Sequence, residues 1–193
     1  SFETDFVTVM RSYLFSTYYN DTHALYEFGA GTGLNLVAAS EIFPDMKFVG
    51  LDWAHSSVQI INALKQKLNI NISGKRFDLF KPDEKYRLDK NSAVLTIGTL
   101  EQLGQNFKPF IRYLLNNKPN ICVHMETLYE GYNNNNLLDY LAIKYLEQRN
   151  YLRGLLPYLK ELEAKRKLKI IEVKRAFGSF YHDGYTYIVW KPI

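Results

Sequence analysis

A glycine-rich run at residues 26–33 carries the residue types most suited to holding a ligand. An acid, Glu27, follows an apolar segment, and three glycines come after it at alternate positions: Gly29, Gly31 and Gly33. A ligand can lie directly on such a backbone, because glycine has no Cβ and tolerates positive φ. The start of a following helix would present unpaired N–H groups to the same space. A dinucleotide site needs G-x-G-x-x-G, but its third glycine would fall at Leu34 or Leu36, so this pattern does not fit.

A second acid supports a nucleotide-like ligand. Residues 47–52 read as an apolar strand that ends in Asp52, 21 positions after Gly31. A carboxylate at the end of the second strand can accept hydrogen bonds from both hydroxyls of a ribose. An acid in this place can also cap the next helix, so the residue alone leaves two interpretations open.

The spacing E-x-G-x-G-x-G, with an acid at the end of the next strand, resembles motif I of the class I S-adenosylmethionine (SAM) dependent methyltransferases. The resemblance extends over residues 22–193. It implies SAM as the cofactor and assigns these cofactor-binding residues: Glu27, Gly29, Ala30, Gly31, Gly33, Asp52, Trp53, Asp78, Leu79 and Gly98.

The resemblance also implies what each of these residues does. The glycines would contact the methionine part of SAM through the backbone, and Glu27 would hold its amino group directly or through water. Asp52 would bind the ribose, Trp53 would lie beside the adenine, and Asp78 would accept from the adenine amino group. Structural alternatives exist for two of them, since Asp78 is also a common turn residue and Trp53 a common core residue.

Candidate catalytic residues follow the fourth and fifth predicted strands. Glu101 lies in a loop at the carboxyl edge of the sheet, where open α/β folds bind ligands; it would orient or deprotonate a methyl acceptor, or cap the next helix. His124 and Glu126 are two apart on a strand and so share a face. Histidine is a frequent general base, although a histidine inside a buried strand is more often part of the core. His182, in the final loop, is a second base candidate. The pair of His124 and Glu126 could also suggest a metal, but no third or fourth ligand is recognisable beside it, so no metal site is predicted.

Hydrophobic periodicity predicts the elements that position these residues. Helices are expected at 2–19, 32–43, 56–68 and 107–115, with Ser56 or Ser57 as an N-cap. Strands are expected at 24–28, 46–51, 73–77, 92–97, 120–125, 168–173 and 185–190. Each of the first five strands is expected to lead into a helical crossover, with a charged turn at 81–90. The last two strands are too close for a helical crossover and predict an antiparallel hairpin.

The expected fold is a three-layer α/β sandwich around a seven-stranded, mostly parallel sheet that ends in this hairpin. Residues 1–193 form a single domain, which begins with a helical segment at 1–21. A helical insertion at 128–167 separates strands five and six and breaks near Gly154 and Pro157. In the family that the chain resembles, additions at this point commonly build the acceptor pocket, and the insertion is rich in tyrosine and arginine.

Composition and charge indicate which cellular compartment and which classes of partner to expect. The chain has a net charge of +4, and its basic residues near 160–169 lack the aromatic or glycine residues of a nucleic-acid motif, so a nucleic-acid partner is not expected. The single cysteine, Cys122, lies in an apolar run and predicts a buried thiol in a reducing compartment. No apolar run approaches 18 residues and no signal peptide opens the chain. These features favour a cytoplasmic location and no membrane partner.

The implied activity is transfer of a methyl group from SAM to an O or N atom of a small molecule, with a sugar or another hydroxylated metabolite as a candidate acceptor. A protein or nucleic-acid methyltransferase is an alternative, although residues 98–101 read Gly-Thr-Leu-Glu where amino-methylating relatives carry Asn/Asp-Pro-Pro-Tyr/Phe. A non-catalytic SAM-binding domain is a second alternative. A nicotinamide dehydrogenase is disfavoured by the glycine spacing.

Overall fold

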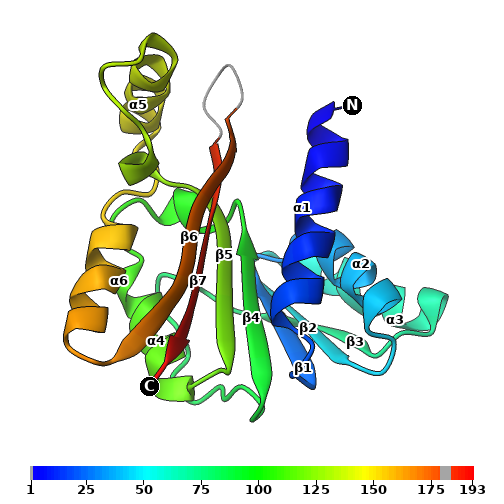
Figure 1. Cartoon of the computed structure of the whole chain (residues 1–193). Helices are drawn as coiled ribbons and strands as arrows, with labels where there is room; N and C mark the ends of the chain where they lie inside the picture. The colour runs from blue at the N-terminus through cyan, green and yellow to red at the C-terminus, as the bar shows by residue number, and fades with distance from the viewer. Residues whose placement is uncertain (1, 179–183) are drawn as a thin grey trace.

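The computed structural model describes residues 2–178 and 184–193, and Figure 1 shows a single twisted sheet with helices packed on it. The strands are β1 (Ala24–Phe28), β2 (Lys47–Asp52), β3 (Ile72–Arg76), β4 (Ser92–Ile97), β5 (Ile121–Thr127), β6 (Leu168–Gly178) and β7 (Gly184–Pro192). The helices are α1 (Phe2–Tyr18), α2 (Leu34–Ile42), α3 (His55–Leu68), α4 (Lys108–Asn117), α5 (Leu137–Arg149) and α6 (Leu155–Ala164), with short 3-10 turns η1 (Leu100–Leu103) and η2 (Tyr129–Gly131).

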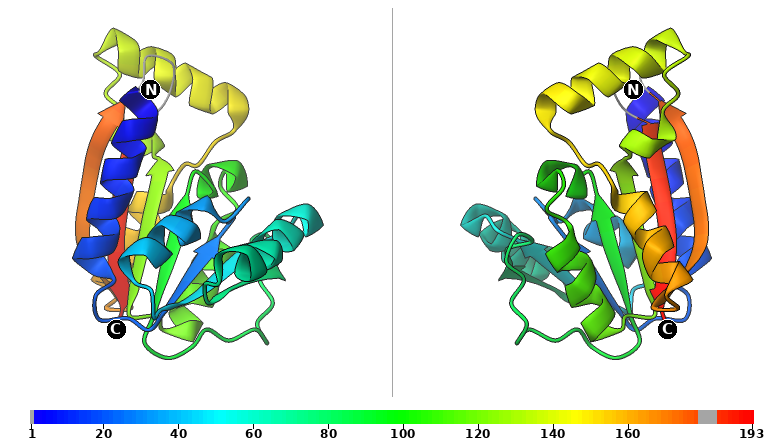
Figure 2. Two further views of the ribbon diagram at one scale, coloured as in Figure 1. Left: turned by 90° about the vertical axis from the view of Figure 1, so that its right-hand side faces the viewer. Right: turned by 90° about the vertical axis from the view of Figure 1, so that its left-hand side faces the viewer.

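The sheet has the expected seven strands in the order β3-β2-β1-β4-β5-β7-β6. The first five strands pair in parallel, and β7 lies antiparallel between β5 and β6. The predicted three-layer sandwich with a closing hairpin is therefore confirmed. Figure 2 shows α1, α2 and α3 on one face and α4 and α6 on the other.

Three local predictions were wrong. The hairpin strands run further than expected, to Gly178 and from Gly184, and the loop between them, with His182, lies outside the described residues. All of residues 77–91 are described, and none forms a helix, so β3 and β4 are joined by an irregular connection. Helix α3 begins at His55 with Ala54 as its N-cap, so Ser56 and Ser57 lie inside its first turn and cap nothing.

The connection after β3 is held by α4 instead of by a helix of its own. Leu88 is buried and its N–H donates to Asn117 of α4 at 3.0 Å. The Tyr113 hydroxyl, also on α4, donates to the carbonyl of Tyr86 at 3.0 Å. These contacts supply the backbone partners that a crossover helix would otherwise provide, and they fix the chain where it passes the end of β3.

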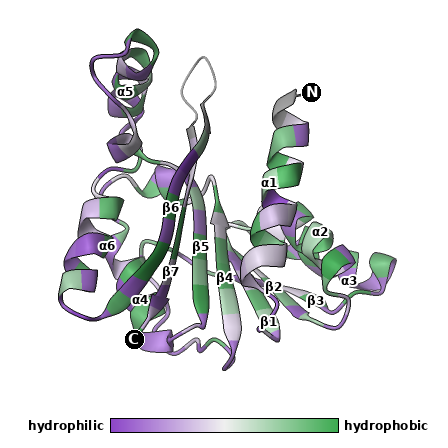
Figure 3. Ribbon diagram, viewed as in Figure 1, coloured by the Kyte–Doolittle hydropathy of each residue, from purple (hydrophilic) through white to green (hydrophobic). Residues whose placement is uncertain are grey.

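Apolar side chains fill both interfaces between sheet and helices, and Figure 3 shows hydrophobic residues along the central strands. On the α4 side, Phe28 packs edge-on against Phe77 and Phe110, with ring centroids 5.1 and 4.8 Å apart. On the other side, α1 is joined to β6 by a hydrogen bond from Tyr18 to Glu172. Cys122 is a buried free thiol, as predicted. The carboxyl ends of β1, β2 and β4 are therefore fixed between two packed layers. No helix in the described ranges is long and apolar enough to cross a membrane.

The insertion between β5 and β6 is helical and broken, as predicted. The break falls at residues 150–154 and ends with Gly154, which is the N-cap of α6. Pro157 does not break the helix, because it lies in the first turn of α6, where its missing N–H needs no partner. Asn136 caps α5 by accepting from the N–H groups of Leu138 and Asp139. In Figure 1, α5 stands beyond the carboxyl ends of the strands, near the described end of the hairpin.

Candidate functional site

A cavity of about 500 Å³ opens at the carboxyl ends of β1, β2, β3 and β4. Seven of the predicted cofactor residues line it: Gly29, Gly31, Asp52, Trp53, Asp78, Leu79 and Gly98. Six further residues line it and were not assigned to the cofactor from the sequence: Phe77, Phe80, Ile97, Thr99, Gln102 and Leu103. Each of these residues is a near neighbour of a predicted one on the same loop. The position of a residue just after a strand end would therefore have indicated them.

The glycine-rich turn is fastened to the end of β2. The N–H groups of Gly29 and Ala30 donate to the carbonyl of Leu51 at 2.7 and 3.2 Å. Gly31 donates to Asp52 Oδ2 at 2.9 Å, and Asp52 Oδ1 accepts from Ala54 N–H at the same distance. These three N–H groups of the turn are therefore used within the protein. A ligand on the turn meets bare backbone and the remaining acceptor capacity of the Asp52 carboxylate.

The glycines around the turn have different roles. An ideal Cβ on Gly31 (φ +52°) or on Gly98 (φ +58°) would meet no protein atom within 4 Å, so both positions open onto free space. A Cβ on Gly29 would lie 2.2 Å from the Thr99 side chain, which makes this glycine a requirement of packing. A Cβ on Gly33 would lie 3.0 Å from Ile61. Two of the four therefore keep the cavity open, and two let neighbouring segments approach.

Three predicted cofactor residues, Glu27, Ala30 and Gly33, are absent from the described lining of this cavity. Glu27 is fully buried, and its Oε1 accepts from Asn35 of α2 at 2.6 Å, while its Oε2 has no partner within the described chain. Burial raises the pKa of Glu27 to about 8, against the lowering effects of Asn35 and Arg11. Strand alternation explains this placement, because Tyr26 and Phe28 face α4 and Glu27 therefore faces the opposite layer.

A second cavity of about 120 Å³ meets the first at Gly98. Its other lining residues are Glu101, Met125, Glu126, Thr127, Tyr151 and Tyr185. Glu126 is 1% exposed; its Oε2 accepts from Glu101 N–H at 3.3 Å, and its Oε1 has no partner among the described residues. Burial raises the pKa of Glu126 to about 7, hydrogen bonds from Thr96 and the η1 backbone lower it, and the charge of Glu101 raises it.

His124, the third predicted catalytic residue, is part of the core. It lines neither of the two described cavities, since it lies two residues before Glu126, deeper in the sheet. Its Nδ1 is 2.9 Å from Thr96 Oγ1, and its ring lies between those of Trp190 and Phe110, at 6.0 and 6.4 Å. Burial lowers the pKa of His124 to about 3, so the ring is neutral at physiological pH.

Known structures share this architecture. The SAM-dependent methyltransferase SibL, in its apo form, superposes with a TM-score of 0.70 at 12% identity, over 97% of this chain and 55% of SibL. The fold is that of the class I methyltransferases. A geranyl diphosphate methyltransferase in complex with SAM gives 0.67 at 12% identity, over 96% of this chain and 85% of the other. The (4+2)-cyclase SpnF gives 0.64 at 13% identity, over 86% and 58%.

These likenesses concern the fold. The chain spans only about half the length of SibL, and no protein-family model or curated sequence matches it. The cyclase SpnF has the same architecture, so a methyltransferase fold does not by itself fix the reaction. The chemistry has to be argued from the two cavities.

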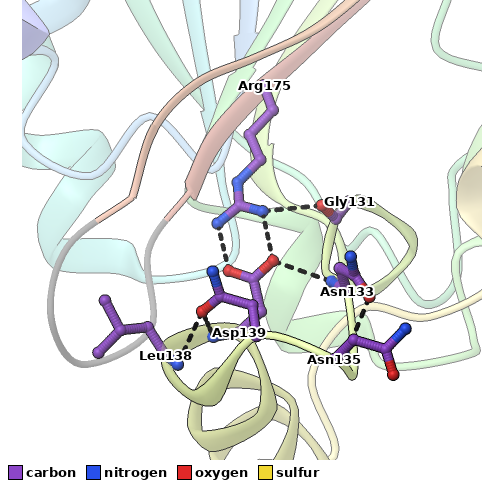
Figure 4. A network of polar contacts seen from close by, with 7 residues as sticks. Gly131, Asn133, Asn135, Leu138, Asp139 and Arg175 are labelled. Atoms are coloured by element: carbon purple, nitrogen blue, oxygen red, sulfur yellow. Dashed lines mark hydrogen bonds and ion pairs between the residues drawn. The ribbon is translucent and has the colours of Figure 1, made fainter.

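In this methyltransferase fold, the insertion reaches the small cavity through Tyr151, which lies between α5 and α6. A polar network fixes the insertion to the sheet (Figure 4): Arg175 of β6 forms two bonds to the Asp139 carboxylate, at 2.8 and 2.9 Å, and a third to the carbonyl of Gly131. The Asn133 N–H also donates to Asp139, at 2.9 Å. Arg175 holds the pKa of Asp139 below its usual range. The base of the insertion is thus fixed beside the small cavity.

Proposed function

We propose that the protein is a SAM-dependent methyltransferase that transfers a methyl group to an O or N atom of a small molecule. The observation that carries the proposal is the pair of open glycine positions, Gly31 and Gly98, on either side of the cavity that contains Asp52. A cavity of about 500 Å³ lies in the range of small-molecule and cofactor sites. It lies at the carboxyl edge of the sheet, the usual ligand position in α/β folds.

The residues present fit SAM. Asp52 would accept from the ribose hydroxyls, for which a carboxylate has acceptor capacity beyond its two backbone bonds. Asp78 is exposed at the cavity and would accept from the adenine amino group, while Phe77 and Leu79 offer apolar contact to the ring. Trp53 is 74% exposed and would cover the adenine from the rim. Gly31 would let the methionine part lie against the backbone.

SAM supplies an activated methyl group on a sulfonium, so the protein chiefly has to align the acceptor and exclude water. The small cavity beyond Gly98 is where the acceptor atom would lie, because it adjoins the cofactor cavity and carries the carboxylates of Glu101 and Glu126. Either acid could orient an acceptor, and Glu126, with its raised pKa, could take up a proton near neutral pH. His124 has no part in this proposal.

Calorimetry tests the cofactor. SAM and its product S-adenosylhomocysteine should bind, and NAD should not. Failure to bind SAM at millimolar concentration would overturn the proposal. The reaction is tested by incubating the protein with methyl-labelled SAM and a metabolite extract. Label should appear in the small-molecule fraction; label only in protein or nucleic acid would refute the small-molecule acceptor, and binding without any transfer would favour a non-catalytic domain.

A further inference from the structure

The small cavity has a strongly one-sided charge. Two carboxylates, of Glu101 and Glu126, face it, and none of its described lining residues is a lysine, arginine or histidine. Tyr151 adds a hydroxyl from the insertion. Tyr151 and Glu101 line the same cavity, and burial, followed by the charge of Glu101, raises the pKa of Tyr151. An acceptor that carries a phosphate or carboxylate at this position would meet two like charges.

Glu126 also needs a hydrogen-bond donor. Its Oε1 is buried and has no partner within the described residues, and an unsatisfied buried carboxylate oxygen is costly. The oxygen belongs to a residue that lines the cavity, but the atom itself is buried, so the Glu126 side chain must turn toward the cavity for a ligand's donor to reach it. This unmet acceptor is the strongest signal of ligand chemistry outside the cofactor cavity.

From these observations we infer that the small cavity accepts a primary or secondary amine, so that the methyl group is transferred to nitrogen. The inference rests on the proposed function. A protonated amine brings positive charge and two or three N–H donors, which matches two acids and a phenol. A hydroxyl brings one donor and no charge, so it can satisfy Oε1 but cannot relieve the repulsion between Glu101 and Glu126.

Glu126 would act as the base in this reaction. An N–H proton of the bound ammonium passes to the Glu126 carboxylate, which becomes a neutral acid, and the nitrogen regains its lone pair. The lone pair then forms the new N–C bond as the C–S bond breaks, and the electron pair of that bond remains on sulfur. The products are an N-methylammonium ion and the neutral thioether S-adenosylhomocysteine. Glu126 returns its proton to solvent when the product leaves.

A divalent cation would be another way to neutralise two carboxylates. The described residues contain no group of three or more acids, histidines or cysteines placed to hold a metal. Two protein carboxylates alone are a sparse ligand set for a hard cation, which takes six or more oxygens. The amine is the better match to what the cavity offers.

The test measures the Glu126 carboxyl directly, without turnover. The protein is labelled with carbon-13 at its glutamate carboxyl groups, saturated with S-adenosylhomocysteine, and titrated by NMR over pH. Three small three-carbon probes are added in turn: n-propylamine, n-propanol and propionate. Glu126→Gln assigns the resonance, Glu101→Gln tests the second acid, and Glu84→Gln, at an exposed position on the β3–β4 connection, is the matched control.

Propylamine should lower the pKa of Glu126 by about one pH unit or more, which corresponds to about a tenfold preference for the ionised acid. Propanol, which brings one donor and no charge, should lower it by clearly less, and propionate should leave it unchanged. Propylamine should bind about tenfold more weakly to Glu126→Gln than to Glu84→Gln. If S-adenosylhomocysteine binds but propylamine has no effect, or propanol acts as strongly, the amine inference is wrong and the proposed function stands. If S-adenosylhomocysteine does not bind at all, both fail.

Discussion

The two cavities share Gly98, but backbone groups dominate the larger one and side chains dominate the smaller one. The larger one is a backbone structure: bare glycines form its edges, and its key acid, Asp52, has both carboxylate oxygens engaged by neighbouring N–H groups. The smaller one is a side-chain structure, and its key acid, Glu126, has one oxygen without a described partner. The first site is complete before a ligand arrives, whereas the second lacks a donor that its ligand must bring.

Substitution of Asp52 should break the larger site and leave the smaller one intact. Asp52→Ala removes the ribose acceptor and frees Gly31 and Ala54 from their anchor, so SAM affinity should fall about 100-fold, as expected for two charge-assisted hydrogen bonds. Glu126→Gln should change SAM affinity by less than about threefold, because it leaves the turn untouched. Calorimetry on both variants measures this contrast. Equal losses in the two would show that the cavities do not work separately.

Glu126 should also make the free energy of unfolding depend on pH. The pKa of Glu126 rises from 4.5 to about 7 on folding, so the folded state holds more protons in that window and stability falls as pH rises from 4.5 through 7. Glu126→Gln removes this loss and should be about 3 kcal/mol more stable than the wild type near pH 8, with little difference near pH 4.5. Denaturant unfolding at several pH values gives the two profiles. Parallel profiles would mean that Glu126 titrates normally.

Substitution of Gly31, which opens onto the cavity, should weaken SAM binding more than substitution of Gly33 in the same turn. Gly31→Ala puts a Cβ into the cavity and should weaken SAM binding about tenfold. Gly33→Ala is the matched control: it carries the same left-handed strain, of about 1 kcal/mol, but its Cβ points at Ile61. It should lose stability with affinity nearly unchanged. Equal affinities in the two variants would contradict the placement of SAM on Gly31.

The larger site could be predicted from the sequence because its geometry is local. Strand ends, a glycine turn and an acid at the next strand end are set by neighbouring residues, and Gly31 and Asp52 therefore lie where the pattern places them. Alternation along a strand is equally local, and it correctly puts His124 and Glu126 on one face. It gives no measure of depth, which is why His124 lies in the core and only Glu126 reaches the cavity.

The smaller site could not be predicted because distant segments meet there. Tyr151 comes from a link between two helices of the insertion, and this link is held by hydrogen bonds to distant segments, such as that of Arg153 N–H to the carbonyl of Gly104 at 3.4 Å. The irregular connection after β3 depends in the same way on α4. Glu27 shows that a sequence motif does not fix where a side chain points. The residue is present at the expected spacing, yet its side chain bonds to Asn35 beneath α2 and lies outside the described lining of the larger cavity.

Substitution of Trp53 should have the smallest effect on SAM affinity, and it should change binding without changing stability. The side chain is 74% exposed, so Trp53→Ala removes little buried surface and should change the free energy of unfolding by less than about 0.5 kcal/mol. If the indole lies over the adenine, the same change should weaken SAM about threefold, while Trp53→Phe keeps an aromatic face and recovers most of the loss. Calorimetry with SAM and with methionine separates the causes, because only the adenine-bearing ligand should respond. An unchanged SAM affinity would remove Trp53 from the site, and the aromatic contact to the adenine would then fall to Phe77 or Phe80, which also line the cavity.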